Sequence, residues 1–436
     1  MQKKVFNQGL LDYLQKSPTP FHATANLADR LAKKGFKELK ETESWNMKPG
    51  KYFVTRNQSS IIAFVLGKKD ALETGIRMSG AHTDSPCLKV KPRPETFRQG
   101  YLQLGVEVYG GVLLNPWYDR DLSLAGRITY QAQYKNKDKK IHNLLIDFKD
   151  PIAVIPSLAI HLDREANKSR SINPQKDIPP IILQSEKNTN FNDLLKAQIK
   201  KEHPKVQVQK ILGYELSFYD TNPASVIGLK SEFIASARLD NLLSCYTGIE
   251  SLLEANPNIT SLVVCSDHEE VGSASAAGAE GPFLMSVLER FIPDTQDRLR
   301  AIAKSLLVST DNAHGIHPNY ADRHDANHGP ILNKGPVIKV NANQRYATNS
   351  ETEAYFSLVC ENNSIPYQKF INRTDMACGS TIGPITAKQI GVKTLDVGVP
   401  TFAMHSIREI AGSDDAYYLY QALKSMFNDT GVLGSE

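Results

Sequence analysis

The sequence predicts an α/β protein whose helix–sheet–helix sandwich is interrupted by an inserted, mainly antiparallel β domain. In the C-terminal half, continuous apolar runs of strand length alternate with helical segments, which is typical of a sheet covered by helices on both faces. In the middle, apolar and polar residues alternate between Gly and Pro residues, which favours antiparallel strands. The 436 residues suffice for one large core and a second domain. We therefore expect a discontinuous α/β domain, residues 1–92 and 235–436, around a β-rich domain, residues 93–234.

The N-terminal part contains two expected helices followed by short strands. Apolar residues recur with helical spacing over the first 35 residues, on one face as Leu10, Leu11 and Leu14 and on another as Leu27, Leu31 and Ala32. The segment "SPTPFH" (17–22) separates the two helices, and its Pro20 suits the start of the second. β-rich runs then predict strands at 52–55, 60–67 and 75–83.

The remaining elements follow from the change in pattern near residue 93. "YLQLGVEVYG", "GRITYQAQY" and "LGYELSFYD" alternate as antiparallel strands do. After residue 235, apolar runs predict strands at 260–266, 306–311, 336–341 and 394–399. Helical segments separate them, near 240–255, 283–306, 350–363 and 414–427. Ser350, with Glu353 three residues later, resembles a capping box for one of these helices.

Composition excludes several classes of function. Lys and Arg number 51 against 47 Asp and Glu, an excess too small for a nucleic-acid-binding or membrane-binding surface. The one basic run, "YKNKDKK" (134–140), is interpreted as a solvated turn. The N-terminus lacks the pattern of a secretory signal, and no apolar stretch approaches the roughly 20 residues that span a bilayer. Five dispersed cysteines without CxxC spacing favour a reducing compartment, so we expect a cytoplasmic protein.

Strong metal-ligating residues follow apolar runs at five places in the chain. The carboxyl ends of strands in an α/β sheet line a common crevice, so these distant segments can converge there. Two imidazoles and several carboxylates, without a thiolate, suit Zn²⁺ or Mn²⁺. The candidates are His82, Asp240, Glu269 with Glu270, Asp311 and His405.

Charge favours two metal ions over one. Carboxylates at Asp240, Glu270 and Asp311, together with a bridging hydroxide, neutralise two divalent cations. A single ion would leave a buried carboxylate without a partner, which is costly. Asp84 lies two residues after His82, where its carboxylate could hold the tautomer of the histidine ring.

Other catalytic classes mostly fail on spacing. "HEEVG" has Gly272 where an HExxH motif needs its second histidine. The sequence contains no Walker-type phosphate loop and no GxSxG nucleophile elbow. A glycosidase using two of the carboxylates at Asp267, Glu269 and Glu270 would leave His82 and His405 unexplained.

Eight motifs, in order, resemble those of the aspartyl aminopeptidase family, which are dinuclear zinc exopeptidases and include a yeast vacuolar leucine-preferring relative. They are "SPTPFH", "SGAHTDSPCLKVKP", "ARLDNL", "DHEEVGS", "DNAHGIHPNY", "GPVIKVNANQRYATNS", "DMACGSTIGPI" and "VPTFAMHSIRE". The resemblance implies a metallopeptidase domain with an inserted dimerisation domain, assembled into a tetrahedral homododecamer.

The resemblance also assigns roles to the candidate residues. It implies two zinc ions per subunit bridged by Asp240, one also bound by His82 and Asp311 and the other by Glu270 and His405. Mn²⁺ or Co²⁺ could use the same ligands. Glu269 would be the general base for hydrolysis of the peptide bond.

Substrate-binding roles are implied for His314, Lys339 and His161. Lys339 interrupts the apolar run "VIKVN"; its ammonium group either reaches solvent at a sheet edge or faces an anionic guest, and the resemblance favours the second. His161 would act in a neighbouring subunit's site or, alternatively, lie on a helix face. Arg345 is a further candidate anion contact, although a structural role fits it better.

The leading hypothesis is a metallo-aminopeptidase that removes N-terminal Asp or Glu from peptides. The same metal centre could instead serve a broad-specificity or leucine-type aminopeptidase, or hydrolysis of small acylated amino acids. A third hypothesis is a metal-stabilised scaffold oligomer without activity, but Glu269 beside Glu270 argues against it, because a structural metal site has no use for a base.

Overall fold

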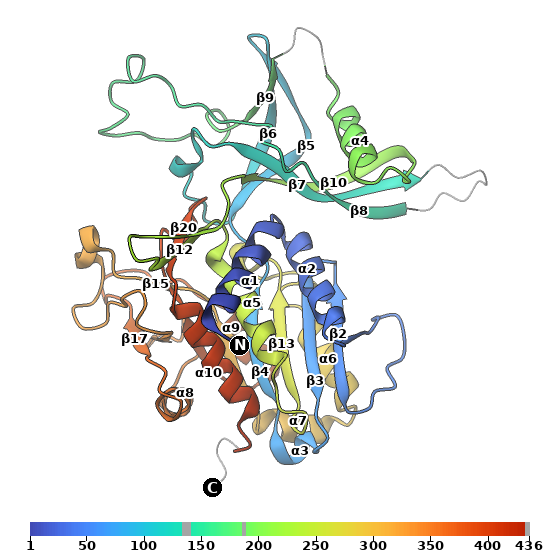
Figure 1. Cartoon of the computed structure of the whole chain (residues 1–436), viewed down its shortest axis with the longest axis vertical. Coiled ribbons are helices and arrows are strands. Elements are labelled where there is room, and N and C mark those ends of the chain that lie inside the picture. Colours follow the sequence, from blue (N-terminus) through green and yellow to red (C-terminus); the bar gives the residue numbers. More distant parts are fainter. Residues whose placement is uncertain (133–140, 185–188, 432–436) are drawn as a thin grey trace. The chain divides into compact units, whose positions relative to one another are not determined.

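A computed structural model describes residues 1–132, 141–184 and 189–431 (Figure 1). The chain forms two compact units. The first comprises Met1–Ser85, Ala224–Met404 and Glu409–Glu436, and the second comprises Pro86–Pro223 and His405–Arg408. The basic run at 134–140, interpreted above as a turn, lies outside the described residues.

A nine-stranded mixed sheet forms the centre of the first unit. Its central strands β13, β4, β14 and β18 run parallel, so their carboxyl ends reach the same edge. The order across the sheet is β1 (Lys37–Glu38), β2 (Gly50–Arg56), β3 (Ser60–Leu66), β13 (Ser261–Ser266), β4 (Arg77–His82), β14 (Leu306–Thr310), β18 (Lys393–Gly398), β16 (Val337–Val340) and β17 (Gln368–Ile371).

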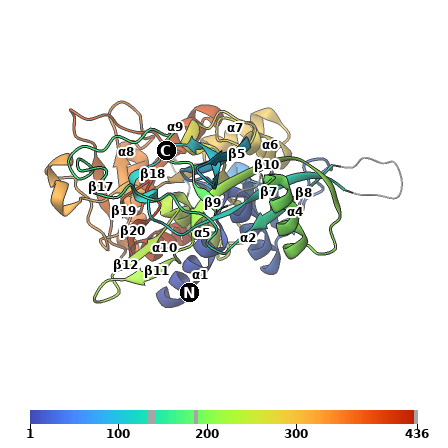
Figure 2. The ribbon, with the colours of Figure 1, turned by 90° about the horizontal axis from the view of Figure 1, so that it is seen from above.

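Helices cover both faces of this sheet, which explains why its strands are apolar without alternation. In β3, Ile61 and Ala63 contribute to one buried cluster, whereas Ile62 and Phe64 contribute to another. Figures 1 and 2 show helices on either side of the sheet. On the first face pack α1 (Lys3–Lys16), α2 (Pro20–Lys33), α5 (Leu239–Leu252), α8 (Ser350–Asn362) and α10 (Asp415–Asn428). On the second lie α6 (Phe283–Phe291), α7 (Thr295–Ala303) and α9 (Ile382–Ile390).

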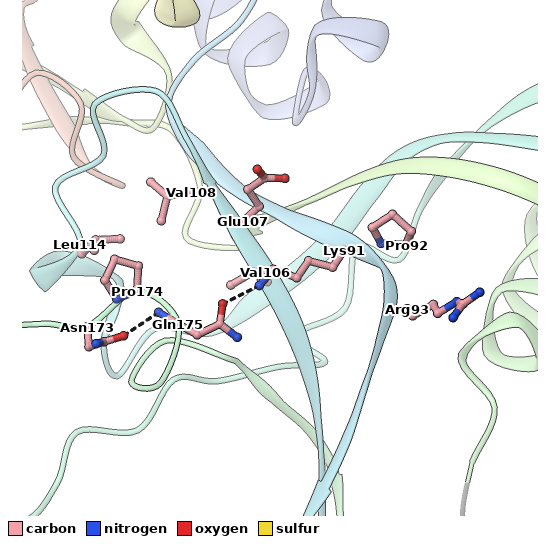
Figure 3. A pocket seen from close by; sticks show the side chains of 10 residues that line it. All are labelled: Lys91, Pro92, Arg93, Val106, Glu107, Val108, Leu114, Asn173, Pro174 and Gln175. Atoms are coloured by element: carbon pink, nitrogen blue, oxygen red, sulfur yellow. Dashed lines mark hydrogen bonds between the residues drawn. The ribbon is translucent and has the colours of Figure 1, made fainter.

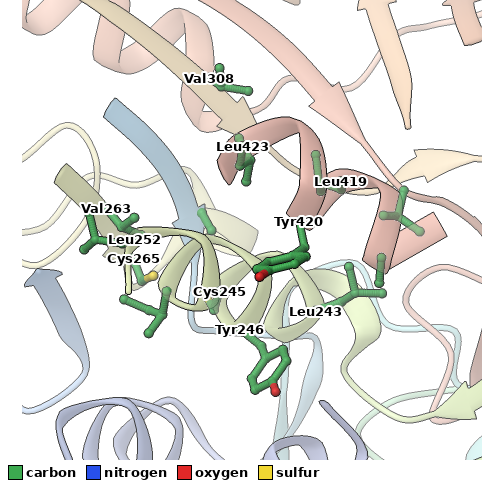
Figure 4. Close-up of a cluster of buried hydrophobic side chains, with 14 of the residues drawn as sticks. Leu243, Cys245, Tyr246, Leu252, Val263, Cys265, Val308, Leu419, Tyr420 and Leu423 are labelled. Atoms are coloured by element: carbon green, nitrogen blue, oxygen red, sulfur yellow. The ribbon is translucent and has the colours of Figure 1, made fainter. Parts of the chain in front are cut away.

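The helix α5 is central to the larger cluster, because all of its residues are buried. Figure 4 shows Leu243 and Tyr246 of α5 in this cluster with Tyr420 and Leu423 of α10 and Val263 of β13. Burial on every side explains why the sequence of α5 lacks a polar face. The first turn of α5, which contains Asp240, is therefore buried like the rest of the helix.

This unit also contains a five-stranded sheet, one strand of which directly precedes α10 in the chain. Its order is β11 (Ser225–Ile227), β12 (Phe233–Ser236), β20 (Glu409–Gly412), β19 (Pro400–Phe402) and β15 (Ala313–His314). Asp415, in the first turn of α10, is buried and accepts hydrogen bonds from the backbone N–H groups of Asn333 (2.6 Å) and Gly335 (2.8 Å). Burial raises the pKa of the Asp415 carboxyl to about 7, and those two hydrogen bonds lower it only partly.

The second unit contains a six-stranded antiparallel sheet with its own buried cluster. Strands β10 and β7 pair along most of their length, and Leu124, Leu216 and Phe218 lie in the cluster beneath them. The order is β8 (Ile141–Asp147), β7 (Leu122–Ala132), β10 (Val208–Asp220), β5 (Cys87–Arg98), β6 (Tyr101–Tyr109) and β9 (Ile181–Gln184). The unit also contains α4 (Phe191–Glu202), which the sequence did not predict.

Several predicted elements need correction in detail. The helix expected at 283–306 is divided into α6 and α7, because Pro293 cannot continue a helix. The capping box of α8 is formed by Asn349 and Thr352, one residue before the predicted pair Ser350 and Glu353. The short elements α3 (Ala71–Thr74), η1 (Asn115–Trp117), η2 (Glu269–Val271) and η3 (Pro318–Arg323) complete the described structure. Within the described residues, no helix is long and apolar enough to cross a membrane.

The raised pKa of Asp415 predicts a specific pH dependence of stability. In the unfolded chain, the pKa of an aspartate is about 4. Between that pH and about 7, the unfolded chain loses this proton while the folded chain keeps it. The free energy of unfolding should therefore fall across this window in the wild type, and the fall should be smaller in Asp415→Asn. Urea unfolding at a series of pH values measures the difference, with the exposed Asp322→Asn as control. Parallel curves for the wild type and Asp415→Asn would contradict the assignment.

Candidate metal centre

Four of the five predicted ligands meet near the carboxyl ends of three neighbouring strands: His82, Asp240, Glu270 and Asp311. His82 is the last residue of β4, Asp311 directly follows β14, and Glu269 and Glu270 lie in η2, shortly after β13. Because β13, β4 and β14 are adjacent and parallel, segments that are far apart in the sequence meet at one edge of the sheet. Asp240 reaches the same place from the first turn of α5.

The distances in this cluster suit metal coordination better than direct hydrogen bonding. The Nε2 atom of His82 lies 3.4 Å from Oδ1 of Asp240 and 3.6 Å from Oδ1 of Asp311. Bonds of about 2.1 Å in a tetrahedral zinc site separate neighbouring ligand atoms by about 3.4 Å. Ligand atoms of His82, Asp240 and Glu270 all lie within 4.8 Å of one another. The donor set therefore fits zinc, with imidazole and carboxylate ligands and no thiolate.

Asp240 is positioned by backbone contacts that sequence reasoning missed. Its N–H group donates to Oε2 of Glu409 at 2.9 Å, and its carbonyl oxygen accepts from the Ser85 hydroxyl at 2.6 Å. Next to it, the side chain of Asn241 donates to the carbonyl oxygen of Thr310 at 2.8 Å. The buried Glu409 opens β20, and a glutamate at the start of an apolar strand is the signal that could have identified it. The positive end of α5 also favours a carboxylate at Asp240.

Asp84 fixes the segment that carries the two glutamates. Its two carboxylate oxygens accept the backbone N–H groups of Glu269 and Glu270, each at 3.1 Å. The Nδ1 atom of His82 is 3.0 Å from the carbonyl oxygen of Asp84 and 3.4 Å from its carboxylate. A hydrogen bond from Nδ1 to that carbonyl oxygen leaves Nε2 free to bind a metal. The backbone of Asp84, more than the predicted carboxylate, thus holds the ring.

Glu269 lies beside the candidate ligands, but farther from His82 than Asp240 and Asp311 do. Its Oε2 atom is 3.9 Å from Nε2 of His82. Burial raises the pKa of Glu269 to about 7; the charge of His82 opposes this rise, whereas those of Asp311 and Asp240 add to it. A carboxylate with a pKa in this range can both accept and donate a proton near neutral pH.

The electrostatics of the cluster show that it needs positive charge. Burial alone would lower the pKa of His82, but the nearby carboxylates of Asp240, Asp311 and Asp84 outweigh burial and raise it well above its usual value. Burial and the nearby Asp84 charge likewise raise the pKa of Asp267. The cluster therefore has an excess of negative charge, and this excess favours the binding of a divalent metal ion.

Lys339 is buried beside the cluster. Its strand β16 lies between β18 and β17, so the alternative that Lys339 reaches solvent at a sheet edge is wrong. The side chain is 2% exposed, and its Nζ atom donates to the carbonyl oxygen of Asn312 at 3.1 Å. The same atom lies 3.6 Å from Oδ2 of Asp311. The ammonium group therefore compensates part of the negative charge of Asp311.

The other two candidates in the first unit are more accessible. His314, in β15, is exposed, and its ring packs edge-on against Phe370 with 6.1 Å between the ring centres. Although the residue has exposed surface, the protein atoms around its ring partly desolvate the imidazole, and together with the charge of Lys339 this lowers its pKa and favours the neutral form. Arg345 is exposed in a loop, and its carbonyl oxygen lies 3.5 Å from the hydroxyl of Ser380.

Two predicted residues belong to the second unit. His405 lies in the segment His405–Arg408, where its Nδ1 atom is 3.1 Å from the carbonyl oxygen of Gly111. Its role as a metal ligand stays a prediction. His161 is exposed in a turn, so the alternative that it lies on a helix face is wrong.

The second unit also contains a broad groove of about 840 Å³, shown in Figure 3. Lys91 donates to the side chain of Gln175 at 2.8 Å across it, and Val106, Val108 and Leu114 contribute apolar surface. None of the predicted catalytic or ligating residues lines this groove.

Comparison with known proteins agrees with this geometry. A model of the aminopeptidase I zinc metalloproteases (M18) matches residues 13–427. A probable M18 family aminopeptidase 2 of Stutzerimonas stutzeri (strain A1501) is 60% identical over 425 residues, covering 97% of this chain and 98% of the relative.

Solved structures give the same result. Ape4, in a cryo-EM structure of its complex with Nbr1, has a TM-score of 0.92 and 40% identity, with 98% of this chain and 86% of that chain covered. The mApe1 dodecamer of S. cerevisiae has a TM-score of 0.83 and 28% identity, with 98% and 96% covered. The predicted α/β fold with a β-rich insertion and the resemblance to zinc aminopeptidases are confirmed. The chain therefore belongs to the M18 family of aminopeptidase I zinc metalloproteases, and it is a zinc-dependent aminopeptidase.

Proposed function

We propose that this aminopeptidase uses two zinc ions and the base Glu269 to remove N-terminal residues from peptides, preferring Asp and Glu. The observation that carries the proposal is the cluster of His82, Asp240 and Glu270, whose ligand atoms lie within 4.8 Å of one another, with Asp311 3.6 Å from His82. A cluster of this size has more ligands than one four-coordinate ion needs once a substrate position is kept open.

The ligands divide naturally between two ions. Asp240 would be the carboxylate shared by the two ions, because it lies close to both His82 and Glu270. His82 and Asp311 would complete one site, and Glu270 with His405 the other. When bound, zinc polarises the scissile carbonyl group and lowers the pKa of water. Mn²⁺ or Co²⁺ could occupy the same ligand set.

Glu269 carries the proton transfers. As general base it takes a proton from the attacking water, and as general acid it returns that proton to the departing amine. The backbone N–H group of Glu269 is held by Asp84, so the start of its side chain is fixed relative to His82. This positioning supports a role that depends on geometry as well as on pKa.

The acidic preference rests on Lys339, with His314 as a second substrate contact. A buried ammonium group near the metal ligands can pair with the carboxylate of an N-terminal Asp or Glu. Its contacts with Asp311 and Asn312 favour a competing candidate, in which Lys339 only supports the metal site and the enzyme acts on leucine or broadly. Substrate comparison distinguishes the two.

We also propose that the chain forms a tetrahedral homododecamer through the β-rich domain at 93–234, the α/β domain comprising 1–92 and 235–436. The dodecamer of the structural neighbour mApe1 supports this assembly. His161 would then act in a neighbouring subunit's site. Peptides in the cytoplasm are the proposed substrates, without nucleic-acid or membrane partners.

Metal analysis tests the dinuclear centre. Zinc-loaded protein should contain two zinc ions per chain by mass spectrometry, and chelation should abolish hydrolysis until zinc is restored. Asp240→Asn should lower the content of both ions, because the proposed bridge is lost, whereas Asp29→Asn on the exposed face of α2 should retain both. A zinc content of one per chain in fully active protein would rule out the dinuclear proposal.

Replacement of Glu269 tests the base. Glu269→Gln should keep its zinc and lose activity by roughly 10²–10⁴-fold, the usual contribution of a general base. Glu289→Gln, at an exposed position on α6, provides the control. Single-turnover hydrolysis of an Asp-peptide measures the loss. Normal hydrolysis by Glu269→Gln would exclude the assigned role.

Lys339→Met tests the acidic preference. If the ammonium group binds the substrate carboxylate, kcat/KM for Asp-peptides should fall about 10- to 100-fold more than for Leu-peptides, as expected for a lost charged hydrogen bond. Zinc content is measured in parallel, because Lys339 also contacts Asp311. Lys369→Met on β17 is the matched control. An equal fall for both substrates would favour the leucine-type or broad-specificity alternative.

A further inference from the structure

A small pocket of about 250 Å³ lies on the face of the large sheet that α6 and α9 cover. It is lined by the end of β13, the loop 278–282, the first turn of α6 and the middle of α9. None of the proposed metal ligands lines it. Pockets for drug-sized molecules occupy roughly 300–1,000 Å³, so this one suits a smaller guest.

Two buried hydroxyl groups face this pocket. Ser266 and Thr386 line it and are each only 5% exposed. In β13 the side chain of Ser266 lies on the same face as Leu262 and Val264, toward α6. Within the described part of the chain, no other group is hydrogen-bonded to either hydroxyl. Their oxygen atoms are therefore available to hydrogen-bond a polar guest in the pocket.

The beginning of α6 adds backbone donors. The N-cap residue Pro282 provides no side-chain cap, and the first turn carries no acidic residue. The first bond within the helix runs from the Ser286 N–H group to the carbonyl oxygen of Pro282 at 2.8 Å. The N–H groups of Phe283, Leu284 and Met285 precede it, at the positive end of the helix and at the pocket wall. Together with the two hydroxyls, they favour an anionic head group.

The rest of the lining specifies the remainder of the guest. Val264, Leu284 and Ile390 provide apolar surface. Glu280 stands at the rim, and its carbonyl oxygen accepts from the side chain of Gln389 at 3.0 Å. An acidic group at the rim complements an ammonium group, and the apolar walls complement an aliphatic side chain.

The pocket is built by a tightly packed loop. A Cβ atom on Gly278 would come within 2.1 Å of the carbonyl oxygen of Ser273, and one on Gly281 within 2.3 Å of that of Ser275. The Ser275 hydroxyl accepts from Gly278 N–H at 2.9 Å and lies 2.8 Å from Nδ1 of His268, the neighbour of Glu269. The loop that forms the pocket wall therefore continues directly from the segment that carries the proposed base.

From these contacts we infer that the pocket binds a free aliphatic α-amino acid, with its carboxylate at Ser266, Thr386 and the start of α6 and its ammonium group toward Glu280. A free α-amino acid is the class of product that an aminopeptidase releases, and an aliphatic one would come from a neutral N-terminal residue rather than from the proposed Asp or Glu. This site is distinct from the metal centre and does not depend on the proposed substrate preference.

The test measures binding of L-leucine to the zinc-loaded protein by calorimetry, with the metal centre saturated by a peptidyl hydroxamate too large for the pocket. Thr386→Val keeps the shape of the side chain and removes the hydroxyl, so the affinity should fall about tenfold or more, as for a lost hydrogen bond to a charged group. Thr24→Val is the matched control, because Thr24 is a buried helical threonine whose hydroxyl also lacks a partner within the described residues.

Two analogues separate the ends of the guest. Leucinamide, which lacks the carboxylate, should bind weakly to the wild type. Glu280→Gln should weaken L-leucine but leave 4-methylpentanoate, which lacks the ammonium group, unchanged. Inorganic phosphate should not compete with L-leucine for the pocket. If phosphate displaced L-leucine, the pocket would be a general anion site and the proposal would be wrong. Absence of leucine binding, equal binding to Thr386→Val and the wild type, or loss of binding in the presence of the hydroxamate would overturn the proposal.

Discussion

The structure of the first unit depends on one electrostatic constraint: several carboxylates are buried at the ends of β4, β13 and β14. Asp84, Asp240 and Asp311 all lie next to His82, and the buried ammonium group of Lys339 lies 3.6 Å from Asp311. Removing such charges from water costs several kcal/mol each unless they are compensated. Compensation by zinc reconciles this cluster with a stable fold, and it explains why zinc dependence and fold belong together in this family.

In the large sheet, residues within the strands pack in the apolar core, whereas the candidate ligands lie at or beyond the carboxyl ends of the strands. Residues within β3 and β13 alternate between two apolar clusters, so both faces of these strands pack in the core. The fully buried α5 then brings Asp240 to the same edge from the first of those faces. The candidate ligand Asp240 is therefore supported by a helix that is buried along its whole length.

Much of this arrangement was predictable because apolar runs end where strands end. The strands at 260–266 and 306–311 correspond to β13 and β14, and Glu269 and Asp311 follow them as expected. Other features depend on contacts that the local sequence does not encode. The hydrogen bond from Asp240 to Glu409 joins residues 169 positions apart, and the interior position of Lys339 follows from strand order rather than from composition. The capping box begins at Asn349 rather than at Ser350, because both residues are suitable N-caps and the local sequence does not distinguish them.

The double hydrogen bond from the Asp84 carboxylate to the backbone of Glu269 and Glu270 couples two parts of the enzyme that the sequence separates by 185 residues. The same residue, through its carbonyl oxygen, orients His82. The proposed ligands and the proposed base therefore share one support, so a change at Asp84 is expected to affect both. Efforts to retune the activity of this enzyme will find more freedom in residues that approach the centre separately, such as those of β15 and β16, than in the strand end that holds both functions together.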